Sequence, residues 1–355
     1  MFDRKNILTA VILIGSSVST IAQAGDYQFN NNLNIPASQK WDTALSINNN
    51  GNVGGQVSNS GNSGFIDNTL VPGYTNPDTN ISPNSVTGLN DNGAFVQQVM
   101  NNDGVYTSPQ NVLSGAEGYY YSSPNATPVV IQDQLSGFQF ANGSYSSYVT
   151  GLSNTGEVAG YAQAPDATNK VFEYNVNTGT YTTLDTTALI AAGADPRTIE
   201  TGGISSNGQY IAINYANAIS GDEYGSIYDT VHNRWVSLMG NTSLELAASA
   251  GFGGTFITGV NKNGEAVGWS YTAYGISSFV LQTATGHLMQ NISDFSAVPG
   301  STVVTGVNDN GMLVGYAGNR AGGNLNFEAT VPVPGVLWLM LAALPGLRWF
   351  RVQQA

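Results

Sequence analysis

A six-residue pattern that recurs six times most restricts how this chain can fold. Its fullest form is Gly, an aliphatic residue, Asn or Ser, two polar residues and Gly, and successive copies begin 42 to 63 residues apart. Five copies close on Asn-Gly. Because this pair favours a type I′ turn, in which both central residues take positive φ, each copy predicts a tight hairpin. The copies are Ser46–Gly51, Gly88–Gly93, Gly151–Gly156, Gly203–Gly208, Gly259–Gly264 and Gly306–Gly311.

Two positions of this turn motif have a predicted structural role. The Asn or Ser at its third position can hydrogen-bond the turn backbone through its side chain. A further Gly stands four residues past the turn in several copies, as at Gly160, Gly268 and Gly315. A Gly inside a strand marks a place where another group approaches the backbone closely, so these residues are expected to lie against a neighbouring segment.

A second hairpin lies between several copies of the turn motif. Val171–Val176 and Thr180–Leu184 flank one such turn, and similar pairs flank His232-Asn233 and Thr285-Gly286. Two hairpins per repeat make four strands, which is the content of a propeller blade. The sequence therefore predicts an all-β repeat fold, a β-propeller of about six blades, with an open β-solenoid or a pair of β-sandwiches as the alternative.

The ends of the repeat region suggest that the ring closes. Asn326–Ala329 follows the last copy and supplies a strand, while Tyr27–Leu33 precedes the first and can pair with it. Such pairing would remove an exposed sheet edge, which otherwise invites aggregation.

Both chain ends have sequence patterns typical of targeting segments. Met1–Ala24 has a basic start, an apolar run and a small-residue site at Ala22 and Ala24, so residues 1–24 are expected to be a signal peptide, with a retained anchor helix as the alternative. Ala329–Leu347 carries no charge and is followed by arginines. It is just long enough for a transmembrane helix, and a buried strand or core helix is its alternative. Residues 25–330 form the predicted β-repeat domain, and residues 331–355 the sorting tail.

Composition excludes several classes of function. The formal net charge is −13 and cysteine is absent, so we expect no nucleic-acid partner, no disulfides and no Cys-based metal site. The two histidines, His232 and His287, fall at hairpin turns or strand starts and do not suggest a catalytic triad. Asp222-Glu223 is the one adjacent acidic pair. We interpret it as a solvated loop, with part of a carboxylate sugar site as the alternative.

Calcium binding is a further alternative. Asn90–Gly93 and Asn308–Gly311 superficially resemble a calcium loop, but Val99 and Ala317 stand where the closing Glu would be needed, so the turn interpretation is favoured. The tyrosines of Tyr119–Tyr121 and Tyr145–Tyr148 fit sugar stacking and core packing equally well.

The repeat resembles the HAF repeat of bacterial extracellular proteins. The resemblance rests on the hairpin of Phe172-Glu173-Tyr174 with Thr178-Gly179-Thr180 and on a G-[IV]-N-x-x-G-x-x-V-G core, over residues 41–320. No copy carries the His-Ala-Phe triplet that names the family, and the copies ending at Gly51 and Gly93 lack the usual strand ending. The resemblance implies an exported, propeller-like protein with no assigned catalytic residues.

The C-terminus is similar to the PEP-CTERM sorting signal in its VPxP variant. Val331, Pro332, Val333 and Pro334 precede an apolar span, and Arg348 and Arg351 close it; Val333 stands where the named motif has an acidic residue. The resemblance implies transient anchoring in the inner membrane, processing by an exosortase-type membrane protease, and release to the surface or exopolysaccharide matrix of a Gram-negative bacterium. A tail that anchors without being cut is the alternative.

Together these observations predict a non-catalytic protein of the cell surface or extracellular matrix, without a cofactor, that associates with extracellular polysaccharide. A carboxylate-based polysaccharide-active enzyme and a calcium-dependent carbohydrate-binding module are the alternatives.

Overall fold

A computed structural model shows two compact units, one formed by Phe29–Glu328 and one by the two chain ends, Met1–Gln28 and Ala329–Ala355. The larger unit carries nearly all of the secondary structure described below. The structure describes residues 28–30, 33, 42–57, 63–71, 84–100, 116–131, 135, 147–236, 254–272, 275–283, 287–292, 298, 300–318, 320 and 322–330.

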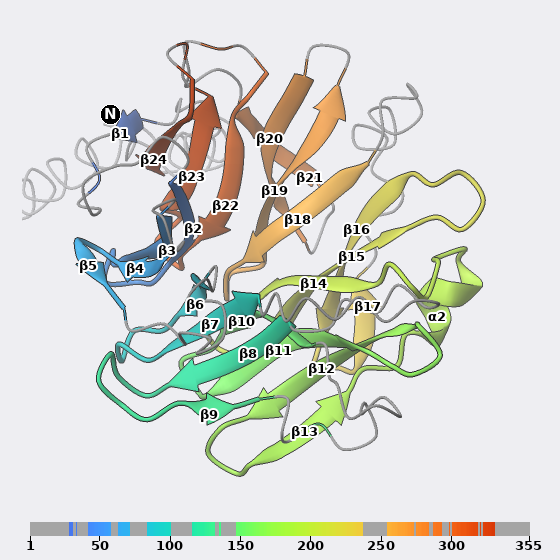
Figure 1. The fold of residues 1–355 in the computed structure, drawn as a ribbon. Coiled ribbons are helices and arrows are strands. Elements are labelled where there is room, and N and C mark those ends of the chain that lie inside the picture. Colours follow the sequence, from blue (N-terminus) through green and yellow to red (C-terminus); the bar gives the residue numbers. More distant parts are fainter. Residues whose placement is uncertain are drawn as a thin grey trace, which may run out of the picture. The chain divides into compact units, whose positions relative to one another are not determined.

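The described strands form six four-stranded antiparallel sheets, here called blades 1 to 6. Each of the first five blades uses four consecutive strands, and the turn motif joins its first strand to its second (Figure 1). Blade 1 contains β2 (Thr43–Ile47), β3 (Val53–Val57), β4 (Ser63–Ile66) and β5 (Thr69–Leu70). Blade 2 contains β6 (Asn84–Leu89), β7 (Phe95–Met100), β8 (Ala116–Tyr121) and β9 (Val129–Val130). Blade 3 contains β10 (Ser147–Leu152), β11 (Glu157–Gln163), β12 (Asn169–Asn175) and β13 (Thr180–Thr183).

The remaining blades follow the same order until the last, which takes its outermost strand from the other end of the chain. Blade 4 contains β14 (Glu200–Ile204), β15 (Tyr210–Ala216), β16 (Glu223–Asp229) and β17 (Arg234–Val236), preceded by the short helix α2 (Thr187–Ala191). Blade 5 contains β18 (Thr255–Val260), β19 (Glu265–Thr272), β20 (Gly275–Gln282) and β21 (His287–Ile292). Blade 6 contains β22 (Val303–Val307), β23 (Leu313–Gly318), β24 (Asn324–Thr330) and β1 (Gln28–Asn30).

The predicted ring closure is confirmed. β1 is the neighbour of β24 in blade 6, and the rings of Phe29 and Phe327 meet edge to face at 5.2 Å between centroids. The first strand of every blade packs against the first strand of the next, and β22 of blade 6 packs against β2 of blade 1. This closed order is that of a six-bladed β-propeller, not of an open solenoid or paired sandwiches.

The core lies between successive blades. One buried cluster joins Val96 of blade 2 to Val149 and Phe172 of blade 3, and others join blades 3 and 4, 4 and 5, and 1 and 6. Since burying one large apolar side chain contributes about 1.5–3 kcal/mol, the packing between these blades contributes substantially to stability.

The turn motif forms tight hairpins as predicted, but they are not type I′ turns. In the first copy Gly51 takes a φ of +82°, whereas Asn50 is absent from the positive-φ residues among those described. Gly51 donates its N–H to the carbonyl of Asn48, and Asn48 donates to the carbonyl of Asn52. This is the three-residue loop in which a type I turn is followed by a left-handed Gly. The side chain of Asn48 favours it, because Oδ1 accepts the N–H groups of Asn50 and Asn52.

The Gly four residues past the turn has the close contacts that were predicted. A Cβ built on Gly268 would overlap the carbonyl oxygen of Phe256 and lie 2.8 Å from the Phe279 ring. Gly160 and Gly315 meet Phe172 and Phe327 in the same way, and so does Gly55, whose copy had seemed irregular. In blades 1, 3, 5 and 6 the ring of a Phe on the third strand thus packs directly against a Gly on the second strand.

Buried polar side chains tie each blade to the next. The first strand of each blade is an edge strand of its own sheet. The N–H and C=O groups on its unpaired side therefore need hydrogen-bond partners from outside that sheet. Asn214 of blade 4 supplies a donor and an acceptor to the backbone of Ile257 in blade 5. Its Nδ2 donates to the carbonyl of Ile257 at 2.9 Å, and its Oδ1 accepts from the N–H of Ile257 at 2.8 Å. Gln98 makes the same double contact with blade 3, and Asn326 of blade 6 makes a similar one with blade 1.

The targeting segments fall largely outside the described residues. Ala22 and Ala24, and Val331, Pro332, Val333 and Pro334, are among the residues not described. The first residues of the uncharged run, Ala329 and Thr330, belong to β24, so the run does not begin as a helix. Among the described residues, no helix has the length and apolar character needed to span a membrane.

Candidate functional site

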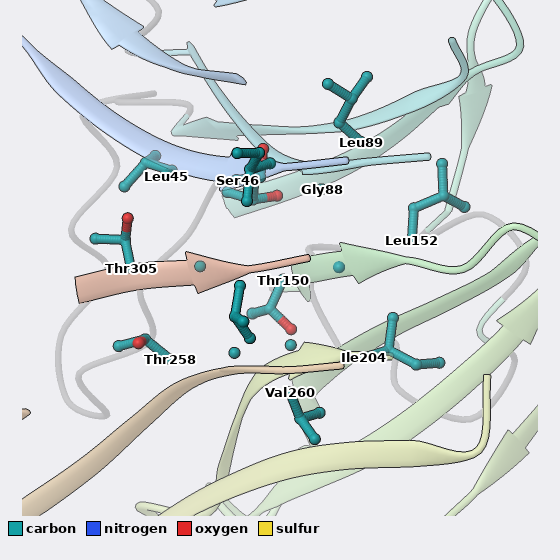
Figure 2. Close-up of a pocket in the computed structure, with 17 residues that line it drawn as sticks. Leu45, Ser46, Gly88, Leu89, Thr150, Leu152, Ile204, Thr258, Val260 and Thr305 are labelled. Atoms are coloured by element: carbon teal, nitrogen blue, oxygen red, sulfur yellow. The ribbon is translucent and has the colours of Figure 1, made fainter. Parts of the chain in front are cut away.

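Three cavities follow one another along the innermost strands of the larger unit. The middle one, about 60 Å³, is lined by residues from all six first strands. Figure 2 shows Leu45, Thr150, Thr258 and Thr305, from four different blades, around this space. A second cavity lies at the turn motifs, and the third, here called the mouth, lies where the first strands begin.

Side-chain hydrogen bonds cross one end of this row of cavities, the end formed by the turn motifs, here called the turn end. The fourth motif residue of each copy contributes to them. Nδ2 of Asn49 donates to Asp91 at 2.8 Å and to Asp309 at 2.7 Å. Oγ of Ser206 in blade 4 donates to Asp309 in blade 6 at 2.6 Å, which skips a blade, and Nζ of Lys262 lies 3.2 Å from the same carboxylate. The cavity left at this end is only about 50 Å³, whereas the mouth measures about 360 Å³, so the mouth is the better place for a ligand.

The mouth is the largest of the three cavities, about 360 Å³, and combines aromatic rings with a carboxylate. Drug-sized ligands occupy cavities of roughly this volume, lined by apolar surface with a few polar groups. None of its lining residues is a Lys, Arg or His. They are Leu45, Thr87, Thr150, Glu200, Thr201, Gly202, Asn214, Phe256, Ile257, Thr258, Trp269 and Thr305.

Corresponding positions on three successive blades carry the large side chains of this region. Tyr148, Glu200 and Phe256 each stand three residues before the first Gly of a turn motif. In blade 3 Tyr148 is opposite Tyr161, and their rings stack with centroids 4.7 Å apart. In blade 5 Phe256 is opposite Trp269, and those rings stack at 4.2 Å. The register of the first hairpin therefore places one carboxylate between two aromatic pairs.

Glu200 is the electrostatic centre of the mouth. Burial raises the pKa of its carboxyl to about 7, and the negative charge of Glu223 adds to the increase, while a hydrogen bond from Tyr161 opposes it. The same surroundings raise the pKa of the Tyr161 phenol, first through burial and then through the charge of Glu200. A carboxyl with a pKa near neutrality can accept or donate a proton at physiological pH, and such groups cluster at functional sites.

Glu223 brings a second carboxylate to this region. It begins β16 and lies against the start of blade 5, because a Cβ built on Gly254 would overlap the side chain of Glu223. Burial raises the pKa of Glu223. The interpretation of Asp222-Glu223 as a solvated loop is thus wrong for Glu223, which is a partly buried strand residue whose charge acts on Glu200.

The other predicted candidates lie away from the mouth. His232 is in the turn before β17, is 58% exposed and contacts Asp229, and His287 begins β21, as predicted. The Asp91 and Asp309 loops are turns, and their carboxylates accept hydrogen bonds from Asn and Ser side chains. Val99 and Ala317 are buried in strands. The described residues contain no group of three or more His, Cys, Asp or Glu positioned around a metal ion.

The tyrosine segments divide between the two roles considered. Tyr119 and Tyr121 are buried, and Tyr121 stacks on Phe95 at 4.8 Å, so this segment belongs to the core. Tyr148 is only half-buried and lies beside the mouth. Tyr145, the other tyrosine of this segment, is outside the described residues.

Comparisons with known proteins identify the fold and not a family. No family model matches the chain, and no curated protein matches it. Among solved structures, a Trypanosoma rangeli sialidase matches with a TM-score of 0.54 at 8% identity, covering 92% of this chain and 62% of that one. The SapL1 lectin in complex with alpha methyl fucoside matches with a TM-score of 0.45 at 13% identity, covering 85% and 97%.

TolB from Acinetobacter baumannii matches with a TM-score of 0.42 at 11% identity, covering 83% of this chain and 65% of that one. The chain thus spans somewhat less than two thirds of both TolB and the sialidase. At these identities the likeness concerns the fold alone.

Proposed function

We propose that this chain is an exported, non-catalytic protein of the cell surface or extracellular matrix whose propeller binds polysaccharide at the mouth. The observation that supports the binding function is the mouth itself, where aromatic rings and a carboxylate line one cavity of about 360 Å³. A pyranose ring presents an apolar face that packs on an aromatic ring, and its hydroxyls donate strong hydrogen bonds to carboxylates.

The proposal of export rests on the sequence patterns at the two ends. Ala22 and Ala24 would precede the first cleavage, and Val331–Pro334 would be recognised by an exosortase-type membrane protease after transient anchoring in the inner membrane. Intact-mass measurement on protein recovered from cells and from medium tests this part. A mature species that lacks residues 1–24 and ends within 331–334 supports it, and an intact Ala355 terminus on the surface protein contradicts cleavage of the tail.

A glycan array tests the binding function, with Trp269→Ala as the site variant. We expect retention of a subset of glycans by the native protein and loss of that retention in the variant. Ile219→Ala is a suitable control, because Ile219 is 95% exposed and outside the mouth lining. Equal retention by native protein and Trp269→Ala would place any glycan site elsewhere.

A carboxylate-based polysaccharide-active enzyme is the second candidate, favoured by the neighbouring Glu200 and Glu223. Glycoside hydrolysis needs one protonated and one ionised carboxyl group, and a pKa of about 7 at Glu200 suits the acid. A reducing-sugar assay on the glycans retained by the array separates the two candidates. Sugar release that disappears in Glu200→Gln would replace the non-catalytic proposal with the enzymatic one.

A further inference from the structure

The mouth carries negative charge without a basic partner. In the described part of the chain, neither Glu200 nor Glu223 forms an ion pair, and no lining residue is basic. The closest basic residue in sequence, Arg197, is 69% exposed and is already paired with Asp195 at 2.6 Å. Ionising the buried Glu200 close to Glu223 costs free energy, and a cation in the mouth would offset that cost.

Resting on the proposed function, we infer that the mouth prefers amino sugars with a free ammonium group over neutral and anionic sugars. The ammonium would lie beside Glu200 and Glu223 while the sugar ring packs against Trp269 and Phe256.

The positions of the acidic and aromatic side chains favour this arrangement. Glu200 and Trp269 line the same cavity, and Glu223 lies against Gly254, two residues before Phe256. A ligand in this cavity that contacts the blade 5 aromatic pair therefore reaches Glu200, and Glu223 lies against the residue before β18. The electron-rich ring faces attract a cation as well, so the aromatic and acidic groups select the same charge. Tyr161 holds Glu200 by a hydrogen bond and would orient its carboxylate.

The competing ligand classes are less compatible with these residues. A uronic or sialic acid would bring a third carboxylate to a cavity without a basic side chain, which is unfavourable at short range. A neutral sugar could pack on the rings but would not offset the cost of ionising Glu200. Calcium would compensate the charge, and the experiment must distinguish it from an ammonium group.

The test is isothermal titration calorimetry at pH 6.5 with three pentasaccharides. These are β1,4-linked glucosamine, its fully N-acetylated form and a galacturonic acid oligomer. We expect the glucosamine oligomer to bind about tenfold more tightly than the N-acetylated one, equivalent to about 1.4 kcal/mol, and the anionic oligomer to bind least.

Two variants separate the site from the general negative charge of the protein. Glu200→Gln combined with Glu223→Gln should lower affinity for the glucosamine oligomer about tenfold more than affinity for the N-acetylated oligomer, so that the preference for the amine is lost. Glu265→Gln, which removes a carboxylate bonded to Asn261 at the turn end, should change neither. Melting curves of the native protein and of both variants show whether all three are folded.

Each contrary result has a separate meaning. Equal affinity for the amine and N-acetylated oligomers would overturn the charge preference and leave glycan binding intact. Binding that requires added calcium would assign the carboxylates to a metal instead. Absence of binding to every oligosaccharide, here and on the array, would overturn both this inference and the proposed function.

Discussion

Replacing Asn326 by Ala should weaken the closure of the ring. Asn326 is 7% exposed, and its Oδ1 accepts from the N–H of Ala44 at 2.8 Å while its Nδ2 donates to the carbonyl of Asp42 at 3.2 Å. The substitution leaves the buried N–H of Ala44 without this acceptor, whereas the carbonyl of Asp42 keeps Nδ2 of Asn324 as a donor at 3.3 Å. Since a buried group left unpaired costs about 1–3 kcal/mol, the free energy of unfolding should fall by roughly 1–3 kcal/mol.

Urea denaturation followed by tryptophan fluorescence measures this loss. With an m-value of about 3 kcal/mol/M, the midpoint should fall by roughly 0.3–1 M. Asn310→Ala is the matched control, because Asn310 also bonds blade 1, through the carbonyl of Asn49 at 3.2 Å, but from an exposed position. Its loss should stay below about 1 kcal/mol. The reasoning fails if Asn326→Ala is no more destabilising than Asn310→Ala.

Two further predictions concern packing and protonation. Gly268→Ala should lower the free energy of unfolding by about 2–3 kcal/mol, measured by thermal or urea denaturation, because the new Cβ would overlap the carbonyl of Phe256. Gly259→Ala is the control, since its Cβ would come no closer than 3.3 Å to a neighbouring atom. Equal losses in the two variants would contradict this reasoning. Because the pKa of Glu200 is raised to about 7 in the folded protein, its contribution to stability is fully present below the unfolded pKa of about 4.3 and is lost as pH rises through 7. Glu200→Gln should flatten this decline, of about 3 kcal/mol at most, in denaturation measured from pH 4.5 to 8; an unchanged profile would assign it to other groups.

Repetition made the fold accessible from sequence. Six copies of one turn motif, a second hairpin between them and a strand at each end of the repeat region were enough to predict blades, their number and their closure. The turn type could not be predicted from Asn-Gly alone, because the side chain of Asn48 stabilises a different backbone conformation two residues away.

The mouth was harder to find because its residues are far apart in sequence and on different blades. Nothing in the local surroundings of Glu200 or Trp269 indicates a site. A signal does exist once the repeats are aligned. Three residues before the motif, blades 3 to 5 carry Tyr148, Glu200 and Phe256, whereas blades 1 and 2 carry Thr43 and Ser85. The proximity of Glu200 to Glu223 depends on the registers in which β15 pairs with β14 and with β16, which sequence spacing does not encode.

A crystal structure of the protein soaked with the glucosamine pentasaccharide tests the central claim most directly. The account predicts six blades closed by β1 beside β24, with a sugar ring against Trp269 and its ammonium group within hydrogen-bond distance of Glu200 or Glu223. A sugar bound at the turn end, or a mouth filled by the protein's own side chains, would contradict it.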